Sequence, residues 1–279
     1  IIIMLNLKYI AGNTKRHAIR CSKRILNQNK IPIINYAVEN KNKKEENYHE
    51  HVTLSNSLDE KYKVAIKLSS FDFDYTLIDK LIDKFKRKNI QVIIDAEKNK
   101  DYLLYKDICN QLIFSHNQHK VNVVKTYQMY RKDELELLKK EYNMFMDNDI
   151  YFGTKIVRGA YWKNECSQGH LFTNKNNTDK SYDGAVRFLT SNYNDKNYNI
   201  LATHNCFSIV IGNCYNKLYH KNVFDFAHLL GMNNNSYNII SNMNNNIHVY
   251  VPYGPYIEIM PYLVIIIYEN LDMLKYMIK

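Results

Sequence analysis

The segment Lys155–Trp162, with the sequence KIVRGAYW, combines residue types that bind ligands at the end of a strand. Its apolar start is typical of a buried strand, which stops at Arg158 and Gly159 before the paired aromatics Tyr161 and Trp162. Glycine allows a ligand to approach the backbone closely, and arginine brings a positive charge to the same place. The segment therefore predicts either a binding site at a strand end or an ordinary glycine turn.

Other apolar runs end in polar residues that could take part in chemistry. Asp95 follows one run, His204 follows another, and Tyr250 lies in the last. Each has a purely structural interpretation, because an aspartate can cap a helix, a histidine can be satisfied in the core and a tyrosine can simply pack. Lys67 and Lys125 lie within apolar runs, where lysine is rarely buried without a partner. If these side chains converge, they form a site for an anionic substrate beside a flat, phosphate-bearing cofactor.

Eight short apolar runs alternate with longer stretches of helical period, which predicts an α/β protein with a distorted (β/α)8 TIM barrel in a single domain. The carboxyl ends of barrel strands converge on one face, so the polar residues above would meet there. A doubly wound sheet is the alternative, and the absence of a G-x-G-x-x-G fingerprint counts against it. The expected strands are Ile31–Ala37, Lys63–Ser69, Ile90–Asp95, Val121–Tyr127, Tyr151–Val157, Tyr198–Thr203, Val223–Leu229 and Ile247–Val251.

Amphipathic patterns predict helices between these strands and one helix before the first strand, as a lead-in at about residues 9–28 capped by Asn13 or Thr14. The first connection, Asn40–Lys61, is charged and poorly periodic, so we expect it to be loosely organised. Asparagine-rich segments surround a weak seventh helix. The clearest expected helices are Asp101–Phe114, Lys132–Met146, Ser181–Asn192 and Ser208–Tyr219. The lead-in helix is expected around Asn13–Leu26, and a final helix near Tyr256–Tyr276.

The 279 residues carry a net charge of +10, which can indicate a nucleic-acid partner. However, the basic residues are scattered, and no nucleic-acid-binding motif accompanies them. Lysine, asparagine, isoleucine and tyrosine are all abundant and share AT-rich codons. Genome composition is therefore the preferred explanation, and no nucleic-acid partner is expected.

The five cysteines include no C-x-x-C pair, which favours a reducing compartment over a disulfide framework. Cys206 and Cys214 lie near His204, but no set of four ligands accompanies them, so no metal is expected. No apolar run is long enough to span a membrane, and the opening residues lack the basic start of a signal peptide. The first residues, Ile1–Ile3, suggest a fragment whose presequence is missing.

These segments resemble, in order and over nearly the whole chain, the sequence blocks of the proline dehydrogenase (proline oxidase) family. One block alone would be weak, whereas this many in the same order are specific. The matching blocks are Tyr9–Thr14, Ile66–Ser69, Ile94–Glu97, Thr126–Gln128, Lys155–Trp162, Ala202–Asn205, Leu229–Met232, Tyr250–Pro255, Pro261–Leu263 and Glu269–Asn270.

The resemblance implies a distorted (β/α)8 barrel that holds FAD and spans residues 1–279 as one catalytic domain. It implies oxidation of L-proline to Δ1-pyrroline-5-carboxylate, with hydride transfer from the ring carbon beside nitrogen to the flavin N5. Electrons would then pass to a membrane quinone. Family members in eukaryotes work in mitochondria at the matrix side of the inner membrane, so peripheral membrane association is also implied.

The resemblance also assigns roles to individual residues. Asp95 and Lys155 are expected to be catalytic, beside the substrate and the flavin. The expected cofactor-binding residues are Ala96, Lys125, Arg158, Gly159, Ala160, Thr203, His204 and Glu269. The expected substrate-binding residues are Lys67, Tyr161, Leu229, Tyr250 and Tyr262.

Two positions depart from the family pattern. The family carries paired arginines for the substrate carboxylate where this chain has Ile265 and Ile266, and no aliphatic side chain replaces a bidentate arginine. The other departure is Lys125, where the family has Asn or Gln against the flavin. Two alternatives follow: an inactive or repurposed flavoprotein of this family, or a related enzyme for a substrate without a carboxylate.

Overall fold

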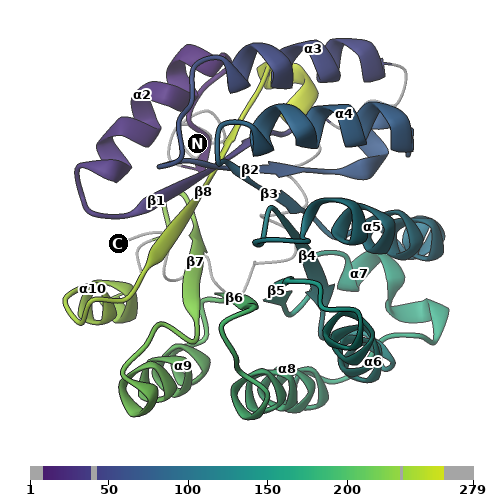
Figure 1. Cartoon of the computed structure of the whole chain (residues 1–279), viewed down its shortest axis with the longest axis vertical. Coiled ribbons are helices and arrows are strands. Elements are labelled where there is room, and N and C mark those ends of the chain that lie inside the picture. Colours follow the sequence, from purple (N-terminus) through teal and green to yellow (C-terminus); the bar gives the residue numbers. More distant parts are fainter. Residues whose placement is uncertain (1–8, 39–42, 233–234, 261–279) are drawn as a thin grey trace.

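Eight parallel strands form a closed barrel in chain order, β1 to β8, in this computed structural model, which describes residues 9–38, 43–232 and 235–260 (Figure 1). Each strand pairs with the next, and β1 pairs with β8 from Ile31–His248 to Tyr36–Tyr253, which closes the ring. The predicted (β/α)8 barrel is confirmed, as are all eight predicted strands. The strands are β1 (Ile31–Tyr36), β2 (Lys63–Ile66), β3 (Gln91–Ile94), β4 (Val123–Gln128), β5 (Phe152–Val157), β6 (Asn197–Ala202), β7 (Asp225–Leu229) and β8 (Ile247–Tyr253).

Helices surround the barrel as an outer ring (Figure 1). The predicted lead-in helix is present and is capped by Thr14, whose hydroxyl accepts the His17 N–H. The helices are α2 (Lys15–Leu26), α3 (Lys44–Ser55), α4 (Tyr75–Lys86), α5 (Tyr102–His116), α6 (Glu134–Asp147), α7 (Trp162–Glu165), α8 (Lys175–Ser191), α9 (Cys206–Tyr219) and α10 (Asn235–Ser241). The described residues also form the short 3₁₀ turns η2 (Leu68–Phe71), η3 (Asn99–Asp101) and η4 (Cys166–Gln168).

The first connection is better organised than the sequence indicates. It contains the three-turn helix α3, which the poor periodicity of the segment did not predict. The helix is fixed by contacts from outside the segment: Lys44 pairs with Asp74 at 3.2 Å, and Glu50 accepts a hydrogen bond from Tyr253 on β8 at 3.0 Å. Residues 256–260 are helical, as predicted, and the remainder of the expected last helix lies outside the described residues.

Two apolar layers hold the barrel together. The outer layer fills the space between strands and helices and includes Ile94, Phe85 and Phe145. Because successive side chains of a strand point to opposite faces, Ile93 belongs instead to the barrel interior. The interior cluster consists of Ile33, Ala65, Ile93, Val121, Val124, Ile200 and Ala227. This apolar cluster fills the barrel interior, so the polar side chains further along each strand line the carboxyl end of the barrel.

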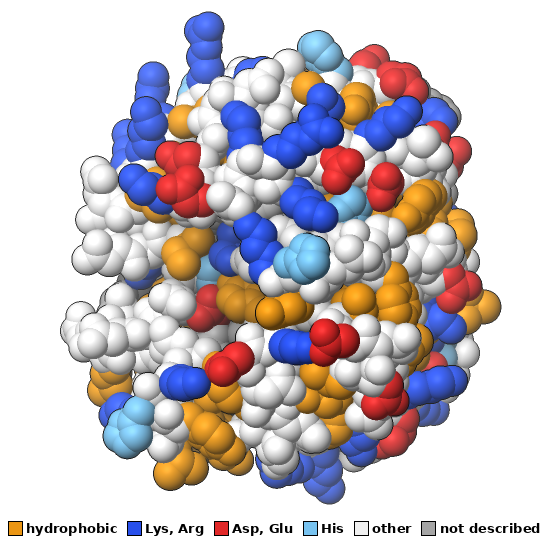
Figure 2. Space-filling model, viewed as in Figure 1, with side chains coloured by type: hydrophobic (Ala, Val, Ile, Leu, Met, Phe, Trp, Pro, Cys, Tyr) orange, Lys and Arg blue, Asp and Glu red, His pale blue; other side chains and the backbone are white. Residues whose placement is uncertain are grey.

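Charged side chains of both signs are spread over the face of the molecule shown in Figure 2. In Figure 2, lysine and arginine side chains are interleaved with acidic ones rather than gathered into one patch. Among the helices that the structure describes, none is both long enough and apolar enough to cross a bilayer.

Candidate active site

An ion pair lies at the carboxyl end of the barrel, next to the interior apolar cluster. The Lys155 ammonium on β5 contacts the carboxylate of Asp95, which directly follows β3. Tyr250 on β8 donates its hydroxyl to the other Asp95 oxygen at 2.5 Å, and its ring packs against the interior cluster. Asp95 and Lys155 are only 8% and 6% exposed, so water screens their interaction weakly. Three strands far apart in sequence thus bring together three predicted site residues.

A second group lies on the neighbouring strand ends. Lys67, immediately after β2, donates its ammonium to the Tyr161 hydroxyl at 2.9 Å. The same ammonium is 5.5 Å from the centroid of that ring, so it lies beyond the hydroxyl end rather than over the ring face. Tyr161 is buried just before α7, at the end of the segment that the sequence singled out. The geometry therefore places a cation and a phenol side by side at neighbouring strand ends.

Gln128 is a residue of the carboxyl face that the site prediction did not include. Its amide donates to the Glu97 carbonyl at 3.1 Å, and its amide oxygen accepts the Ala160 N–H at 3.4 Å. Glu134 fixes the strand end by accepting the Gln128 backbone N–H at 2.9 Å. Gln128 shares the inward row of β4 with Val124, so strand alternation could have found it.

Lys125 does not reach this face, and the prediction that it binds the cofactor is wrong. It occupies the opposite row of β4 from Val124, so its side chain points outward to the helices. There its ammonium contacts Glu141 of α6 at 2.7 Å and Asn110 of α5 at 3.0 Å. Lys125 and Glu141 are both almost fully buried and form an internal ion pair of the barrel wall.

Glycine is required at position 159 because the backbone there passes close to the Tyr130 ring. Its φ of +135° favours glycine, and a Cβ atom there would lie 2.5 Å from the Tyr130 ring. The next residue, Ala160, is exposed, and Ala96 after β3 is half-buried. These small residues leave the backbone of two strand ends open to a ligand.

Arg158 points away from the Asp95–Lys155 pair. Its guanidinium donates to Asp179 of α8 at 2.6 Å, to Thr203 at 2.7 Å and to Ser208 of α9 at 3.0 Å. It also lies 4.4 Å from the Tyr182 ring centroid. Arg158 therefore connects the ends of β5 and β6 to the helices, and it brings the predicted residue Thr203 into one network with itself.

His204 follows Thr203 and is half-buried. Burial and the nearby His228 lower the pKa of His204 to about 4, so its imidazole is neutral at physiological pH. A neutral imidazole offers one donor and one acceptor rather than a charge. Leu229, at the end of β7, is half-buried and packs beside Met232. The predicted residues Tyr262 and Glu269, like Ile265 and Ile266, lie outside the described residues.

The described residues fit a flat cofactor with polar edges, such as FAD. Thr126 pairs with Lys155 in the β4–β5 register and belongs to the inward row of β4. Its hydroxyl is buried without a hydrogen-bond partner in the part of the chain that the structure describes, which favours a ligand atom beside it. Gln128, the backbone near Ala160 and neutral His204 add donors and acceptors around the same opening. Over the same ranges, no group of three or more His, Cys, Asp or Glu residues is arranged to hold a metal ion.

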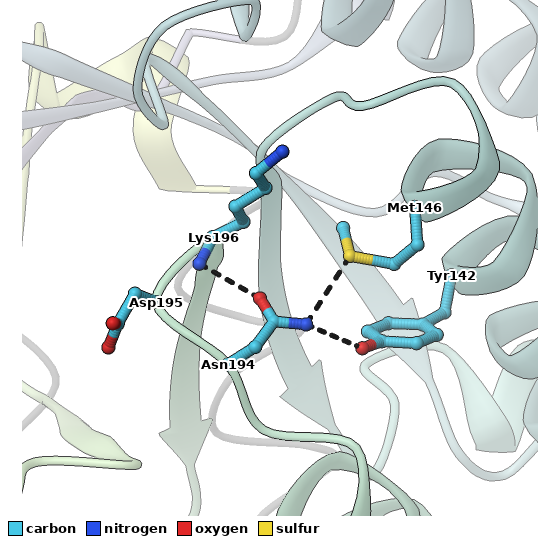
Figure 3. Close-up of a pocket in the computed structure, with 5 residues that line it drawn as sticks. All are labelled: Tyr142, Met146, Asn194, Asp195 and Lys196. Carbon is cyan, nitrogen blue, oxygen red and sulfur yellow. Dashed lines mark hydrogen bonds between the residues drawn. The ribbon is translucent and has the colours of Figure 1, made fainter.

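A surface pocket of about 480 Å³ lies elsewhere in the molecule (Figure 3). Tyr142 and Met146 on α6 line it together with the loop 194–196 before β6, so it is at the amino ends of the strands. The Asn194 amide is tied to the Tyr142 hydroxyl at 3.1 Å and to the Met146 sulfur at 3.6 Å. The pocket contains none of the predicted site residues, and its hydrogen bonds serve to fix the loop.

A closed parallel barrel with a buried ion pair and flanking tyrosines at its carboxyl face has the organisation of a (β/α)8-barrel enzyme, since active sites of this fold lie on that face. The sequence makes the assignment narrower. The family described as proline dehydrogenase matches residues 5–277, and the chain belongs to that family.

Individual relatives agree with this assignment. The chain is 28% identical over 214 residues to proline dehydrogenase 1, mitochondrial, of Dictyostelium discoideum, covering 70% of this chain and 37% of the relative. It is 27% identical over 198 residues to the carbapenem antibiotics biosynthesis protein CarD of Pectobacterium carotovorum subsp. carotovorum, covering 70% and 52%. The chain thus spans between about a third and a half of these relatives' length.

Solved structures confirm the fold. Proline utilization A from Bdellovibrio bacteriovorus, inactivated by N-propargylglycine, superimposes with a TM-score of 0.88 at 18% identity. The superposition covers 96% of this chain and 33% of that protein. At 18% identity, this similarity shows the shared barrel fold alone.

Proposed function

We propose that residues 1–279 form the FAD-dependent catalytic domain of a proline dehydrogenase, which oxidises L-proline to Δ1-pyrroline-5-carboxylate. The observation that carries this proposal is the buried Asp95–Lys155 ion pair, held by Tyr250 at the carboxyl face of a barrel of this family.

Lys155 supplies a fixed positive charge to this face. A preorganised cation stabilises negative charge that develops in a transition state, most strongly where water is excluded. Asp95 fixes the ammonium, and the Tyr250 hydroxyl fixes Asp95 in turn. Both charges therefore keep one arrangement while the substrate reacts.

The substrate side of the site is formed by Lys67 and by apolar and aromatic walls. Lys67 offers a point charge to a carboxylate, next to the Tyr161 hydroxyl. We propose Tyr161, Leu229 and Tyr250 as the described walls around a small ring. Tyr262 remains a proposed wall from the sequence.

FAD bound at this face supplies the two-electron chemistry that amino-acid side chains lack. The residues proposed to hold it share a position at the carboxyl ends of β3 to β6. They are Ala96, Gln128, Arg158, Gly159, Ala160, Thr203 and His204, with Glu269 proposed from the sequence. Arg158 and Thr203 support this surface through their mutual hydrogen bond, whereas neutral His204 offers hydrogen bonds.

We also propose that electrons leave to a membrane quinone and that the protein works at the matrix side of the mitochondrial inner membrane. The names of several relatives, such as the Dictyostelium protein, support the mitochondrial location. The alternative, a flavoprotein of this family that does not oxidise proline, is favoured by Ile265 and Ile266 at the positions of the paired arginines.

The proposal is tested by steady-state oxidation of L-proline with an artificial electron acceptor. We expect the purified holoprotein to turn over proline, and Lys155→Met to lower kcat by at least about a hundredfold, because it removes a preorganised charge. Lys63→Met is the matched control, since Lys63 lies at the amino end of the barrel, 4.4 Å from the Tyr198 ring centroid. A wild-type protein that retains flavin but turns over no proline would contradict the proposal.

A further inference from the structure

Tyr161 has two lysines beside it, one of which the predicted site does not include. The Lys98 ammonium lies 5.7 Å from the centroid of the Tyr161 ring. Lys67 lies at the hydroxyl end of the same ring, 2.9 Å from its oxygen. Tyr161 is 3% exposed, whereas Lys67 and Lys98 are half-buried. Two ammonium groups from the ends of β2 and β3 therefore converge on one phenol at the mouth of the barrel.

Two other cations at the ends of the strands are matched by carboxylates. Lys155 pairs with Asp95, and Arg158 pairs with Asp179. In contrast, the Lys98 ammonium makes no hydrogen bond or ion pair with any residue in the ranges 9–38, 43–232 and 235–260. A half-buried ammonium loses part of its hydration, and an anion placed next to it restores that loss.

We propose that Lys98 is a substrate-binding residue that, together with Lys67, holds the carboxylate of the substrate. This inference rests on the proposed oxidation of proline and adds a second cation to the substrate-binding site. A carboxylate beside the Tyr161 hydroxyl end would be attracted by both ammonium groups and would relieve the repulsion between them. The side chains of Ile265 and Ile266, where the family carries its arginine pair, offer no charge for this task.

The backbone fixes where Lys98 can act. Lys98 follows Asp95 by three residues, and its carbonyl accepts the Asp101 N–H at 3.0 Å, which starts η3. Glu97, between them, accepts the Ser69 N–H at 2.8 Å and so ties this loop to the end of β2. The loop is thereby anchored next to both Asp95 and Lys67, and Lys98 can serve the same substrate molecule.

The test compares L-proline with pyrrolidine, the same ring without a carboxylate, in the holoprotein. Lys98→Met is expected to raise KM for proline by about tenfold to a hundredfold with little change in kcat, as for loss of a charged hydrogen bond. Oxidation of pyrrolidine is expected to be unchanged. Lys98→Arg keeps the charge and is expected to keep KM within a few-fold. Lys100→Met removes an exposed lysine two residues away and is the matched control.

The outcomes separate this inference from the proposed function. If the wild type oxidises proline and Lys98→Met leaves its KM within about twofold, the role of Lys98 is overturned and the proposed function stands. If the wild type oxidises no proline, the proposed function fails. The inference is then decided by calorimetric titration with tetrahydrofuran-2-carboxylate: weaker binding by Lys98→Met than by wild type supports it, and equal or absent binding by both overturns it.

Discussion

At the scale of single residues, Gly159 allows the backbone after β5 to pass close to the Tyr130 ring. Any side chain at this position meets the Tyr130 ring, and the φ of +135° adds backbone strain. We expect Gly159→Ala to lower the free energy of unfolding by about 2–4 kcal/mol, as for overpacking combined with an unfavourable backbone conformation. Gly169→Ala is the control, because φ is +80° there but no atom lies within 4 Å of the added Cβ. Urea denaturation measures both, and equal losses would contradict the steric explanation.

Lys125 and Glu141 form a deeply buried ion pair of the barrel wall. Lys125→Met leaves Glu141 buried and unpaired, so we expect the free energy of unfolding to fall by about 3–5 kcal/mol. The double variant Lys125→Met/Glu141→Gln removes both charges and should recover much of this loss. Flavin content per folded molecule should not change, because the ammonium lies outside the barrel interior. Loss of flavin from a variant that stays folded would contradict this prediction and show that Lys125 contributes to cofactor binding.

The misplacement of Lys125 has a simple physical cause. The sequence shows that a lysine lies within a buried strand, but the direction of its side chain depends on the register of alternation. Val124 lies in the interior cluster, so Thr126 and Gln128 share the inward row and Lys125 does not. The partner of Arg158 was equally hidden, because Asp179 on α8 is 21 residues away in the chain. The position of Asp95 was easier to predict, since it directly follows an apolar strand.

At the scale of elements, Glu134 joins the start of α6 to the end of β4 and to α5. Its carboxylate accepts the Gln128 backbone N–H at 2.9 Å and the Tyr102 hydroxyl at 2.6 Å. Burial raises the pKa of Glu134 from 4.5 to about 7, against the opposing effect of these donors. The folded state therefore binds the proton more tightly than the unfolded chain does.

This raised pKa predicts the direction of a pH effect on stability. The contribution of Glu134 is fully present below the unfolded pKa of 4.5 and is lost as the pH rises to about 7. Gln cannot ionise, so the free energy of unfolding of Glu134→Gln should not fall over this range. Between about pH 5 and pH 8 we expect it to rise by about 2–3 kcal/mol relative to that of the wild type. Chemical denaturation across this range measures the difference. A stability difference independent of pH would show that Glu134 ionises normally in the folded protein.

Other elements show where sequence patterns suffice. The strands β3 and β5 were found because their apolar runs are buried on both faces. Helix α3 was not found, because its polar surface gives little periodicity and its position depends on Asp74 and Tyr253, which are distant in sequence. Whether such a segment forms a helix depends more on its contacts with the rest of the protein than on its local helix propensity.

At the scale of the whole molecule, the barrel turns a scattered set of residues into one site. Lys67, Asp95, Lys155 and Tyr250 span 184 positions of sequence, yet hydrogen bonds and ion pairs place them, with Tyr161, at one face. The sequence predicted this convergence through the barrel rule and through the family resemblance. Which cation holds the substrate depends on side-chain directions, and for that reason Lys98 could not be recognised before the fold was known.

The central claim is that this face holds a flavin which accepts electrons directly from proline. Anaerobic titration of the flavin-loaded protein with L-proline, followed by the visible absorbance of the oxidised flavin, tests it most directly. We predict that proline bleaches the flavin of the wild type and that Lys155→Met slows the bleaching strongly. A yellow wild-type protein whose absorbance does not change at any proline concentration would contradict the account.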